Sequence, residues 1–374
     1  MSDDKIYLDF IKWLGSTWWG LPEAEELLPL IKIRYSPEEA AAFTNLPFSE
    51  TSLEDLAKLK GMDPGELEAL LESGARKGVI FKMQRAGGVR YRLIDSFMVF
   101  LRSVYWGGPE GEDRKAMAPY IERYFVHGFF DQFSHARTRG LRTLPVERTI
   151  EDTRAILPFE DVVKVLEDQD YFCASHCSCK WTHNLTPYSH TCEHNTEVCL
   201  HFGDLARYIV ANGHGREITR EECREILLEC AEAGLVHGVS NWKTPVDTIC
   251  NCCQDCCMFF KAYHLLGHGK SLDVSNYRVR THPETCAGCG LCVKRCPMNA
   301  LKLEKHPEAK NRFGKASVLN PDLCLGCGVC AFKCPTESLV LERRAEITEP
   351  PDNPGVFIGR FMADKANPLP RRKA

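Results

Sequence analysis

CAGCGLCVKRCP at residues 286–297 and CLGCGVCAFKCP at residues 324–335 decide how this chain folds. Both stretches have the spacing Cys-x2-Cys-x2-Cys-x3-Cys-Pro. Two-residue gaps let three successive thiolates converge on one small volume, so the fourth ligand must come from elsewhere. The glycines inside the loops allow unusual φ angles and let backbone N–H groups face an anionic group, at positions Gly288, Gly290, Gly326 and Gly328. The pattern therefore predicts two [4Fe-4S] clusters.

The two stretches closely resemble the bacterial two-cluster ferredoxins. In that family the fourth cysteine of each run ligates the other cluster. The resemblance implies one cluster on Cys286, Cys289, Cys292 and Cys334, and a second on Cys324, Cys327, Cys330 and Cys296. The insertion EKHPEAKNRFGKASV at residues 304–318 departs from the smallest members and affects the connecting loop, not the ligands. A pair of zinc knuckles is the alternative, which eight cysteines at ferredoxin spacing disfavour.

Composition indicates a globular chain. Its 374 residues suffice for two or three domains, and 44% hydrophobic content supplies their cores. A formal net charge of -4 gives no case for a nucleic-acid partner from bulk charge. The start, MSDDKIYLDF, lacks the basic and apolar regions of a signal peptide, so we expect the twenty cysteines to be reduced, in the cytoplasm. The best apolar stretch, residues 97–106, is interrupted by Arg102, and no membrane span is expected.

Residues 48–95 predict two short helices followed by a hairpin. Ser52 and Asp63 are placed to cap the helices, and Gly61 and Gly78 to end them. The hairpin strands are expected at residues 79–81 and 89–93. This order of elements resembles a winged helix.

A winged helix suggests DNA binding, but the charges on the expected recognition helix argue against it. Its first turns carry Asp63, Glu66, Glu68 and Glu72, and its cations, Arg76 and Lys77, come only at the far end. The carboxylates would repel phosphates. We therefore favour a structural or docking role, with DNA binding as the alternative.

A second population of cysteines precedes the ferredoxin-like runs. It comprises Cys177, Cys179, Cys192 and Cys199 in one group, and Cys250, Cys252, Cys253, Cys256 and Cys257 in another. Adjacent cysteines make poor disulfides because a vicinal bridge strains the backbone, whereas metal coordination accommodates them. Each group could hold one further cluster, or the two could pool ligands around one site. Iron-sulfur is favoured, and zinc is the alternative.

Other cysteines and histidines in this region have simpler interpretations. A helix is expected after the capping box Thr219-x-x-Glu222, with Cys223 and Cys230 on its apolar stripe as core residues. Cys173 is left undecided. The histidines invite a mixed Cys/His site or a proton relay, but histidines in surface loops are commoner and none is singled out: His176, His183, His190, His194, His201, His214 and His237.

With these motifs named, residues 50–340 resemble the 4Fe-4S dicluster-domain proteins of anaerobic bacteria and archaea. Those proteins place a winged-helix-like segment before CxC, CLxFG and CNCC motifs. Here CLHFG occupies residues 199–203 and CNCC residues 250–253. The resemblance implies iron-sulfur electron transfer and little beyond it.

The predicted fold class is α+β, in four parts. These are a helical and winged-helix-like domain (1–95), a helical cysteine-rich metal or cluster domain (96–270), a two-[4Fe-4S] ferredoxin domain (271–345) and an extended C-terminal arm (346–374). The arm is expected because the tail is rich in proline and polar residues. Phe357, Ile358 and Phe361 could anchor it to the body or to a partner.

Electron transfer is the predicted function. The sequence contains no GxGxxG, Walker or GxSxG motif, and a fully ligated cluster needs no acid, base or nucleophile, so no catalytic residue is assigned. We expect a multi-cluster protein, or a subunit of an oxidoreductase, that passes single electrons between low-potential carriers and a redox partner. The alternatives are a redox-sensing transcription regulator acting through the winged helix, and a reductase with a substrate-active cluster at residues 250–257.

Charge predicts the kind of redox partner. Residues 277–344 carry twelve Lys and Arg against six Asp and Glu, a formal charge of +6. Each oxidised cube with its four thiolates carries about -2, which leaves the loaded segment near +2. A partner with an acidic or neutral surface is therefore expected.

Overall fold

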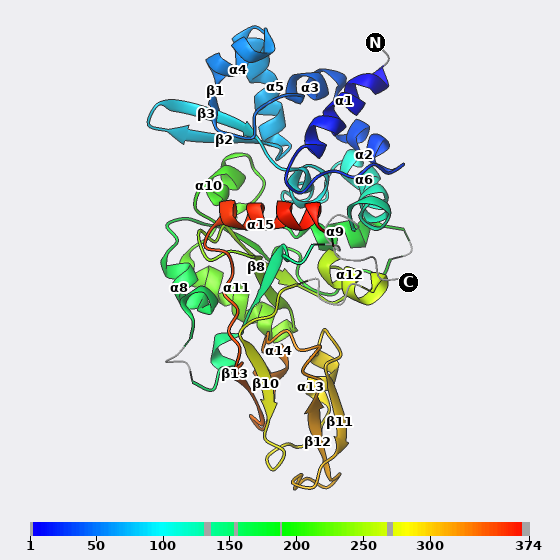
Figure 1. Cartoon of the computed structure of the whole chain (residues 1–374), viewed down its shortest axis with the longest axis vertical. Coiled ribbons are helices and arrows are strands. Elements are labelled where there is room, and N and C mark those ends of the chain that lie inside the picture. Colours follow the sequence, from blue (N-terminus) through cyan, green and yellow to red (C-terminus); the bar gives the residue numbers. More distant parts are fainter. Residues whose placement is uncertain (1–2, 131–135, 153–155, 188, 268–271, 369–374) are drawn as a thin grey trace. The chain divides into compact units, whose positions relative to one another are not determined.

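A computed structural model describes residues 3–130, 136–152, 156–187, 189–267 and 272–368 (Figure 1). They mix helices with strands, so the α+β class is confirmed. The chain divides into two compact units: Met1–Arg137, Cys173–Glu217 and Arg360–Ala374 form the first, and Thr138–Phe172 and Ile218–Gly359 the second. The domain boundaries expected at residues 95 and 345 stay predictions, and the one at 270 lies outside the described residues. None of the helices in these ranges has the length and apolar character needed to cross a bilayer.

The first unit opens with three helices, α1 (Asp3–Gly15), α2 (Leu27–Arg34) and α3 (Pro37–Phe43). Ser36 starts α3 through a complete capping box, because its hydroxyl accepts from Glu39 N while the Glu39 carboxylate accepts from Ser36 N. Phe10, Tyr35 and Phe43 pack together behind these helices, with ring centroids 5.2 to 6.2 Å apart. The helical part expected within residues 1–95 thus begins with three separate helices, and residues 16–26 between α1 and α2 are not helical.

The predicted pair of capped helices and the hairpin follow in the same unit. α4 (Leu53–Lys60) and α5 (Pro64–Arg76) are capped by Ser52 and Asp63, and Gly61 ends α4 in the left-handed conformation. β2 (Ile80–Arg85) and β3 (Gly88–Leu93) form the hairpin. β1 (Thr51–Ser52) pairs with β3, which gives the strand order β1-β3-β2 (Figure 1).

The rest of the first unit combines helices with three short strands. The helices are η1 (Met98–Arg102), α6 (Glu112–Tyr124), η2 (Phe125–Phe129), α9 (Ser178–Leu185) and α10 (Gly203–Ala211). The strands β6 (Cys199–Phe202), β5 (Phe172–Ser175) and β7 (Arg216–Glu217) are neighbours in that order.

Before residue 268, the described part of the second unit contains strands β4 (Leu141–Leu144), β8 (Val236–Ser240) and β9 (Thr248–Cys252), which are neighbours in that order. Its helices before residue 270 are η3 (Glu147–Thr149), η5 (Pro158–Glu160), α8 (Val162–Glu167), α11 (Arg220–Ala233) and α12 (Met258–Leu266). α11 begins where Thr219 accepts from Glu222 N, and Cys223 and Cys230 are buried on it, as predicted.

Residues 96–270 are not simply helical, and that expectation is corrected. The strands there are only two to five residues long, and β5, β6 and β8 are buried at every position. A short strand with both faces buried shows no alternation of apolar and polar residues. The hydrophobic pattern of the sequence therefore did not indicate these strands.

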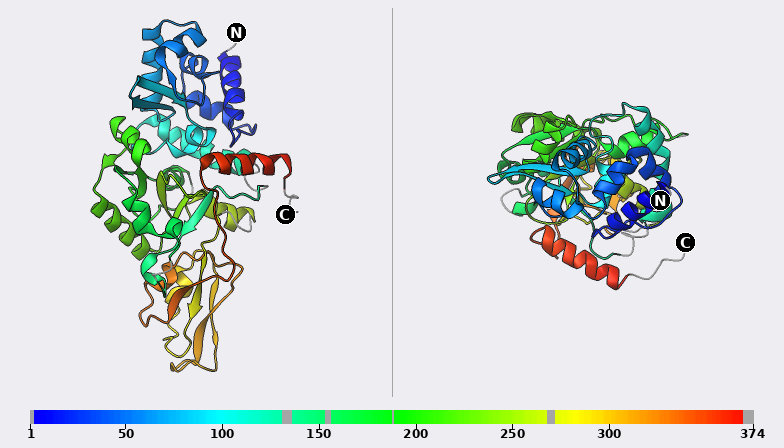
Figure 2. Two further views of the ribbon diagram at one scale, coloured as in Figure 1. Left: turned by 60° about the vertical axis from the view of Figure 1, so that its left-hand side comes forward. Right: turned by 90° about the horizontal axis from the view of Figure 1, so that it is seen from above.

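Residues 277–344, here called the ferredoxin-like module, contain two antiparallel strand pairs. β10 (Tyr277–Thr281) pairs with β13 (Leu339–Arg343), and β11 (Leu301–Lys305) with β12 (Lys315–Leu319). The two pairs lie side by side, and β10 contacts β12 (Figures 1 and 2). Two short helices, α13 (Leu291–Arg295) and α14 (Val329–Phe332), follow the two cysteine loops. The insertion at 304–318 forms the outer part of the β11–β12 hairpin.

The C-terminal tail is a second correction, because residues 354–366 form helix α15 (Pro354–Ala366) and not an extended arm. Val356 N donates to Asn353 Oδ1 at 3.1 Å, which caps the first turn. Phe357 and Phe361 lie four residues apart on one helix face and are both fully buried. Burial of these two aromatic side chains outweighs the polar composition of the tail.

Candidate iron-sulfur centre

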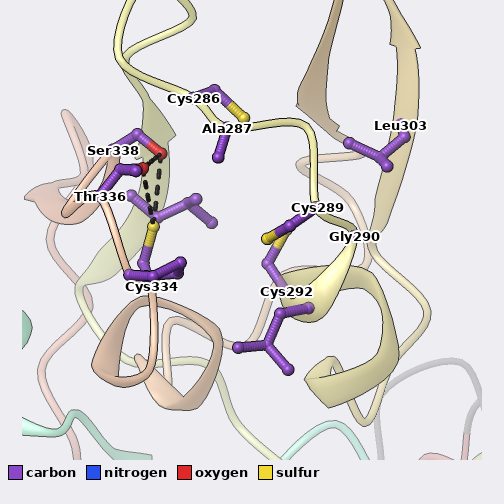
Figure 3. Close-up of a pocket in the computed structure, with 12 residues that line it drawn as sticks. Cys286, Ala287, Cys289, Gly290, Cys292, Leu303, Cys334, Thr336 and Ser338 are labelled. Carbon is purple, nitrogen blue, oxygen red and sulfur yellow. Dashed lines mark hydrogen bonds between the residues drawn. The ribbon is translucent and has the colours of Figure 1, made fainter. Parts of the chain in front are cut away.

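Four cysteines from the two runs surround one pocket in the ferredoxin-like module: Cys286, Cys289, Cys292 and Cys334. The first three belong to the loop that leads into α13 and to the start of that helix, and the fourth follows α14. Figure 3 shows Cys334 on one side of the pocket, with Cys289 and Cys292 across from it. The pocket thus gathers the four residues that the resemblance assigns to one cluster.

Hydrogen bonds with hydroxyl groups lower the pKa of two of these thiols and so oppose the effect of burial. Burial raises the pKa of Cys334, but Ser338 Oγ at 3.3 Å, Thr336 Oγ1 at 3.8 Å and nearby backbone N–H groups leave it below the usual value (Figure 3). Burial raises the pKa of Cys292, whose thiol donates to Ser317 Oγ at 3.3 Å. A lowered pKa favours the thiolate, the form that binds iron. The surroundings of Cys334 therefore favour its thiolate form.

The other four cysteines of the runs form a second, buried set. Burial, together with the neighbouring thiols of Cys296 and Cys324, raises the pKa of Cys327 to about 12. Burial also raises the pKa of Cys330 well above its usual value, with added contributions from Cys327, Cys296 and Cys324. Ala300 N donates to Cys296 Sγ at 3.2 Å. The thiols of this set therefore raise one another's pKa, which is expected of four neighbouring ligands.

The donor atoms of both sets fit an iron-sulfur cluster. Each set offers four thiols, and no carboxylate or imidazole is among the residues that line the first pocket. All eight side chains are thiols without a disulfide. Soft donors of this kind suit iron-sulfur clusters or zinc and not hard cations such as Mg²⁺. Gly290 and Gly328, with φ of 76° and 81°, turn the loops into α13 and α14 in a conformation that favours glycine.

The second loop is held on several sides by the rest of its unit. Val146 N donates to Cys327 O at 3.0 Å, and Arg344 Nη2 to Cys324 O at 2.8 Å. Arg295 donates to Val329 O at 2.9 Å and to two carbonyls at the end of α11, Ala231 O at 2.8 Å and Glu232 O at 2.9 Å. α14 accordingly packs against α11 and η3.

The first loop is open by comparison. Cys289 is exposed, whereas six of the other seven cysteines of the two runs are buried and Cys334 is intermediate. Asn311 Nδ2, from the insertion, donates to Cys286 O at 2.7 Å and to Lys315 O at 2.6 Å. A partner from outside could therefore approach the first set, whereas the second is enclosed.

The upstream cysteines of the first unit lie near the ends of secondary structure. Cys177 is the N-cap of α9, Cys179 lies in the first turn of that helix, and Cys199 begins β6. A hydrogen bond with the Cys179 thiol, together with burial, raises the pKa of Cys177 well above its usual value. Cys192 is buried, and its backbone N donates to Asn184 Oδ1 at 2.7 Å. Cys177 and Cys179 are thus brought into contact.

The upstream cysteines of the second unit lie on β9 and in the turn that precedes α12. Cys252 hydrogen-bonds with the thiols of Cys250 and Cys257, and these contacts and burial raise its pKa well above the usual value. Cys253 and Cys256 form a separate grouping with Asp255, whose ligand atoms all lie within 4.8 Å of one another. Sequence reasoning missed Asp255, and its place between two of the cysteines was the available signal.

Several histidines prove to be buried rather than in surface loops. Ser175 Oγ lies 2.8 Å from His201 Nε2, and His237 Nδ1 lies 2.6 Å from Asn251 Oδ1. Burial lowers the pKa of His214 and of His237 to about 4 each, and that of His201 well below its usual value. These side chains are therefore neutral near pH 7. Cys173, left open by the sequence, is a buried thiol on β5 whose pKa burial raises to about 12.

Comparison with known families identifies the C-terminal module. Residues 285–338 match the family model of the 4Fe-4S dicluster domain, and this range contains all eight cysteines of the two sets. A search of curated proteins finds no match to the chain. The segment is thus a ferredoxin-like iron-sulfur domain, with the capacity to transfer electrons.

Proposed function

We propose that this chain is a multi-cluster electron-transfer protein, or a subunit of an oxidoreductase, that relays single electrons between a low-potential carrier and a redox partner. A [4Fe-4S] cube, when bound, supplies one-electron chemistry without substrate ligation. The observation that carries the proposal is the pair of four-cysteine sets within one module, one set open and the other enclosed. A chain rich in cysteines suits the reducing cytoplasm of an anaerobe.

The ligand assignment in this proposal exchanges the fourth cysteine between the two runs. Cys286, Cys289 and Cys292 would hold one cube together with Cys334, and Cys324, Cys327 and Cys330 the other with Cys296. The pocket lined by the first set and the mutual pKa effects within the second support this exchange. Helix α13, which carries Cys292, packs against α14, which carries Cys330, and this contact supports a short path for electrons between the two sets.

The experiment that tests the relay is anaerobic reduction of the purified chain by a small photoreduced deazaflavin. We expect the visible absorbance of the clusters to fall and to return on reoxidation, with about one electron taken up per cube. Absorbance that does not respond, in a preparation with full iron and sulfide content, would rule the relay out.

We further propose that the upstream cysteines bind additional iron-sulfur clusters, with zinc as the alternative. The thiol contacts of Cys177 with Cys179, and of Cys252 with Cys250 and Cys257, support metal binding there. Zinc would make these sites structural and redox-silent, because a d¹⁰ ion closed in by thiolates carries no electron.

Replacing Cys252 and Cys253 together by serine separates these two cases. Loss of iron, sulfide and part of the visible absorbance would support additional clusters. Loss of zinc with an unchanged iron signal would refute them. The double change Cys223→Ser and Cys230→Ser is the matched control, since these two buried cysteines lie on α11 as core residues and should not alter the content of either metal.

For the N-terminal segment we propose a winged-helix arrangement used for docking and not for DNA. The order of α3, β1, α4, α5, β2 and β3 supports this topology. Two cations of the hairpin are already engaged, because Arg85 pairs with Glu50 at 2.7 Å and with Asp204 at 2.8 Å, and Lys82 pairs with Glu72 at 2.7 Å. DNA binding that is sequence-specific and survives heparin would overturn this assignment.

A further inference from the structure

The insertion in the β11–β12 hairpin is built against the first cysteine loop. Asn311 Nδ2 donates to Cys286 O, and Asn311 Oδ1 accepts from Phe313 N at 3.0 Å. A Cβ added at Gly288 would come within 3.0 Å of Asn311 Oδ1, so loop and insertion approach each other closely. Asn311 therefore fixes the insertion beside the exposed Cys289.

Two large apolar side chains are left exposed at this place. Leu291, which lines the pocket of the first set, is 38% exposed, and Phe313 is 51% exposed. The Arg312 guanidinium lies 4.6 Å from the centre of the Phe313 ring. Aromatic residues and arginine are enriched at protein–protein interfaces. This pair beside an exposed cysteine is therefore typical of a protein contact surface.

Positive charge gathers on the same side of the hairpin. Lys305 lies directly opposite Lys315 in the β11–β12 register, on the face of β11 that also presents Leu303 to the pocket. Like charges opposite each other destabilise a hairpin. Lys310 and Arg312 add two cations in the connecting turn. Among the described residues none of these four cations pairs with a carboxylate, and all four are exposed.

From this geometry we propose that an acidic electron-carrier protein docks on the surface formed by Cys289, Leu291, Lys305, Lys310, Arg312, Phe313 and Lys315, here called the insertion surface. The inference rests on the proposed function. The carrier is oxidised by one electron, which enters the module beside Cys289, and no proton or other atom changes place. Charge complementarity selects the carrier, while Leu291 and Phe313 supply the apolar contact.

The test measures binding of a strongly acidic flavodoxin to the full-length, anaerobically purified chain by calorimetry. For the double variant Lys305→Glu with Arg312→Glu, we expect the dissociation constant to rise at least about tenfold at low ionic strength. The effect should shrink as salt is added, because salt screens exposed charges. Phe313→Ala should weaken binding at both low and high salt, because its contact is apolar.

The matched control is Lys302→Glu with Lys58→Glu. It makes the same change in net charge, but Lys302 lies on the opposite face of β11 and Lys58 on α4. We expect its dissociation constant to stay within about twofold of the unchanged chain. Equal weakening by both double variants, or by neither, would overturn the insertion surface as the docking site.

A second measurement keeps this test separate from the proposed function. All variants should retain their iron and should be reduced by photoreduced deazaflavin at the rate of the unchanged chain, because a small reductant needs no docking surface. If the clusters of the unchanged chain resist deazaflavin, the relay itself is wrong. If the clusters accept electrons from deazaflavin but the dissociation constant of flavodoxin is the same with and without the charge reversals, only the docking inference is wrong.

Discussion

The two cysteine loops have the same spacing but opposite surroundings. Residues 324–330 are buried at every position, and their carbonyls accept hydrogen bonds from Arg344, Val146 and Arg295. The first loop contains the exposed Cys289, and its hydrogen bonds include one from Asn311 to Cys286 O and one from the Cys292 thiol to Ser317 Oγ. Spacing therefore determines which atoms a cluster would bind, whereas distant parts of the chain determine which set is enclosed.

Removal of one ligand from each loop gives the largest expected difference. Cys289→Ser should lose about four irons per chain and leave the chain folded, because each ligand serves one cube. Cys327→Ser should lose a similar amount of iron and also lower the free energy of unfolding, since a hydroxyl is left in a fully buried loop. Iron analysis and denaturant unfolding measure both effects. Unchanged iron in Cys289→Ser would show that the ligand assignment is wrong.

Alanine in place of glycine should distinguish the loops by stability. At Gly326, with φ of 73°, an added Cβ would lie 2.2 Å from both Ser275 Oγ and Tyr277 O. At Gly288, with φ of 66°, the nearest atom is Asn311 Oδ1 at 3.0 Å, the end of a side chain that can move. Left-handed strain costs about 1–2 kcal/mol and overpacking adds about 1–3 kcal/mol.

We therefore expect the free energy of unfolding to fall by about 3 kcal/mol or more in Gly326→Ala, and by about 1–2 kcal/mol in Gly288→Ala. Urea unfolding of the two variants under one set of anaerobic conditions checks this difference. Equal losses would mean that the second loop is no more tightly enclosed than the first.

Substitutions of two neighbouring cations on α13 should differ by a smaller amount in their effect on stability. Arg295 joins the second loop to α11, because it donates to one carbonyl of the loop and to two carbonyls of α11. Lys294 is exposed. We expect Arg295→Ala to lower the free energy of unfolding by about 2–3 kcal/mol and Lys294→Ala to change it by no more than about 0.5 kcal/mol. Arg295→Lys should not restore stability, because an ammonium group cannot reproduce the planar fork. A full rescue by lysine would contradict this role of the guanidinium.

Much of the chemistry could be predicted from the sequence, because it depends on local spacing. The two cysteine runs, the caps at Ser52 and Asp63 and the start of α11 at Thr219 involve residues only a few positions apart. The enclosure of the second loop could not be predicted in this way. It depends on Val146 and Ala231, which are far from Cys327 in the sequence.

Other parts of the fold were missed for identifiable reasons. Helix α15 was not predicted, because the proline and polar residues of the tail favour an extended segment. The Asn353 cap and the helical spacing of Phe357 and Phe361 are the features that indicate a helix. The strands β5 and β6 are too short and too uniformly buried to show a pattern. Asp255 lies between Cys253 and Cys256, but a single aspartate among cysteines does not by itself indicate a metal ligand in a sequence.

Iron, acid-labile sulfide and zinc per chain, measured on protein purified without oxygen, test the central claim most directly. We predict at least about eight irons with matching sulfide, the content of two cubes, and more if the upstream cysteines also hold clusters. Fewer than about eight irons after anaerobic reconstitution, with zinc in place of the missing iron, would contradict the assignment of two [4Fe-4S] clusters to the ferredoxin-like module.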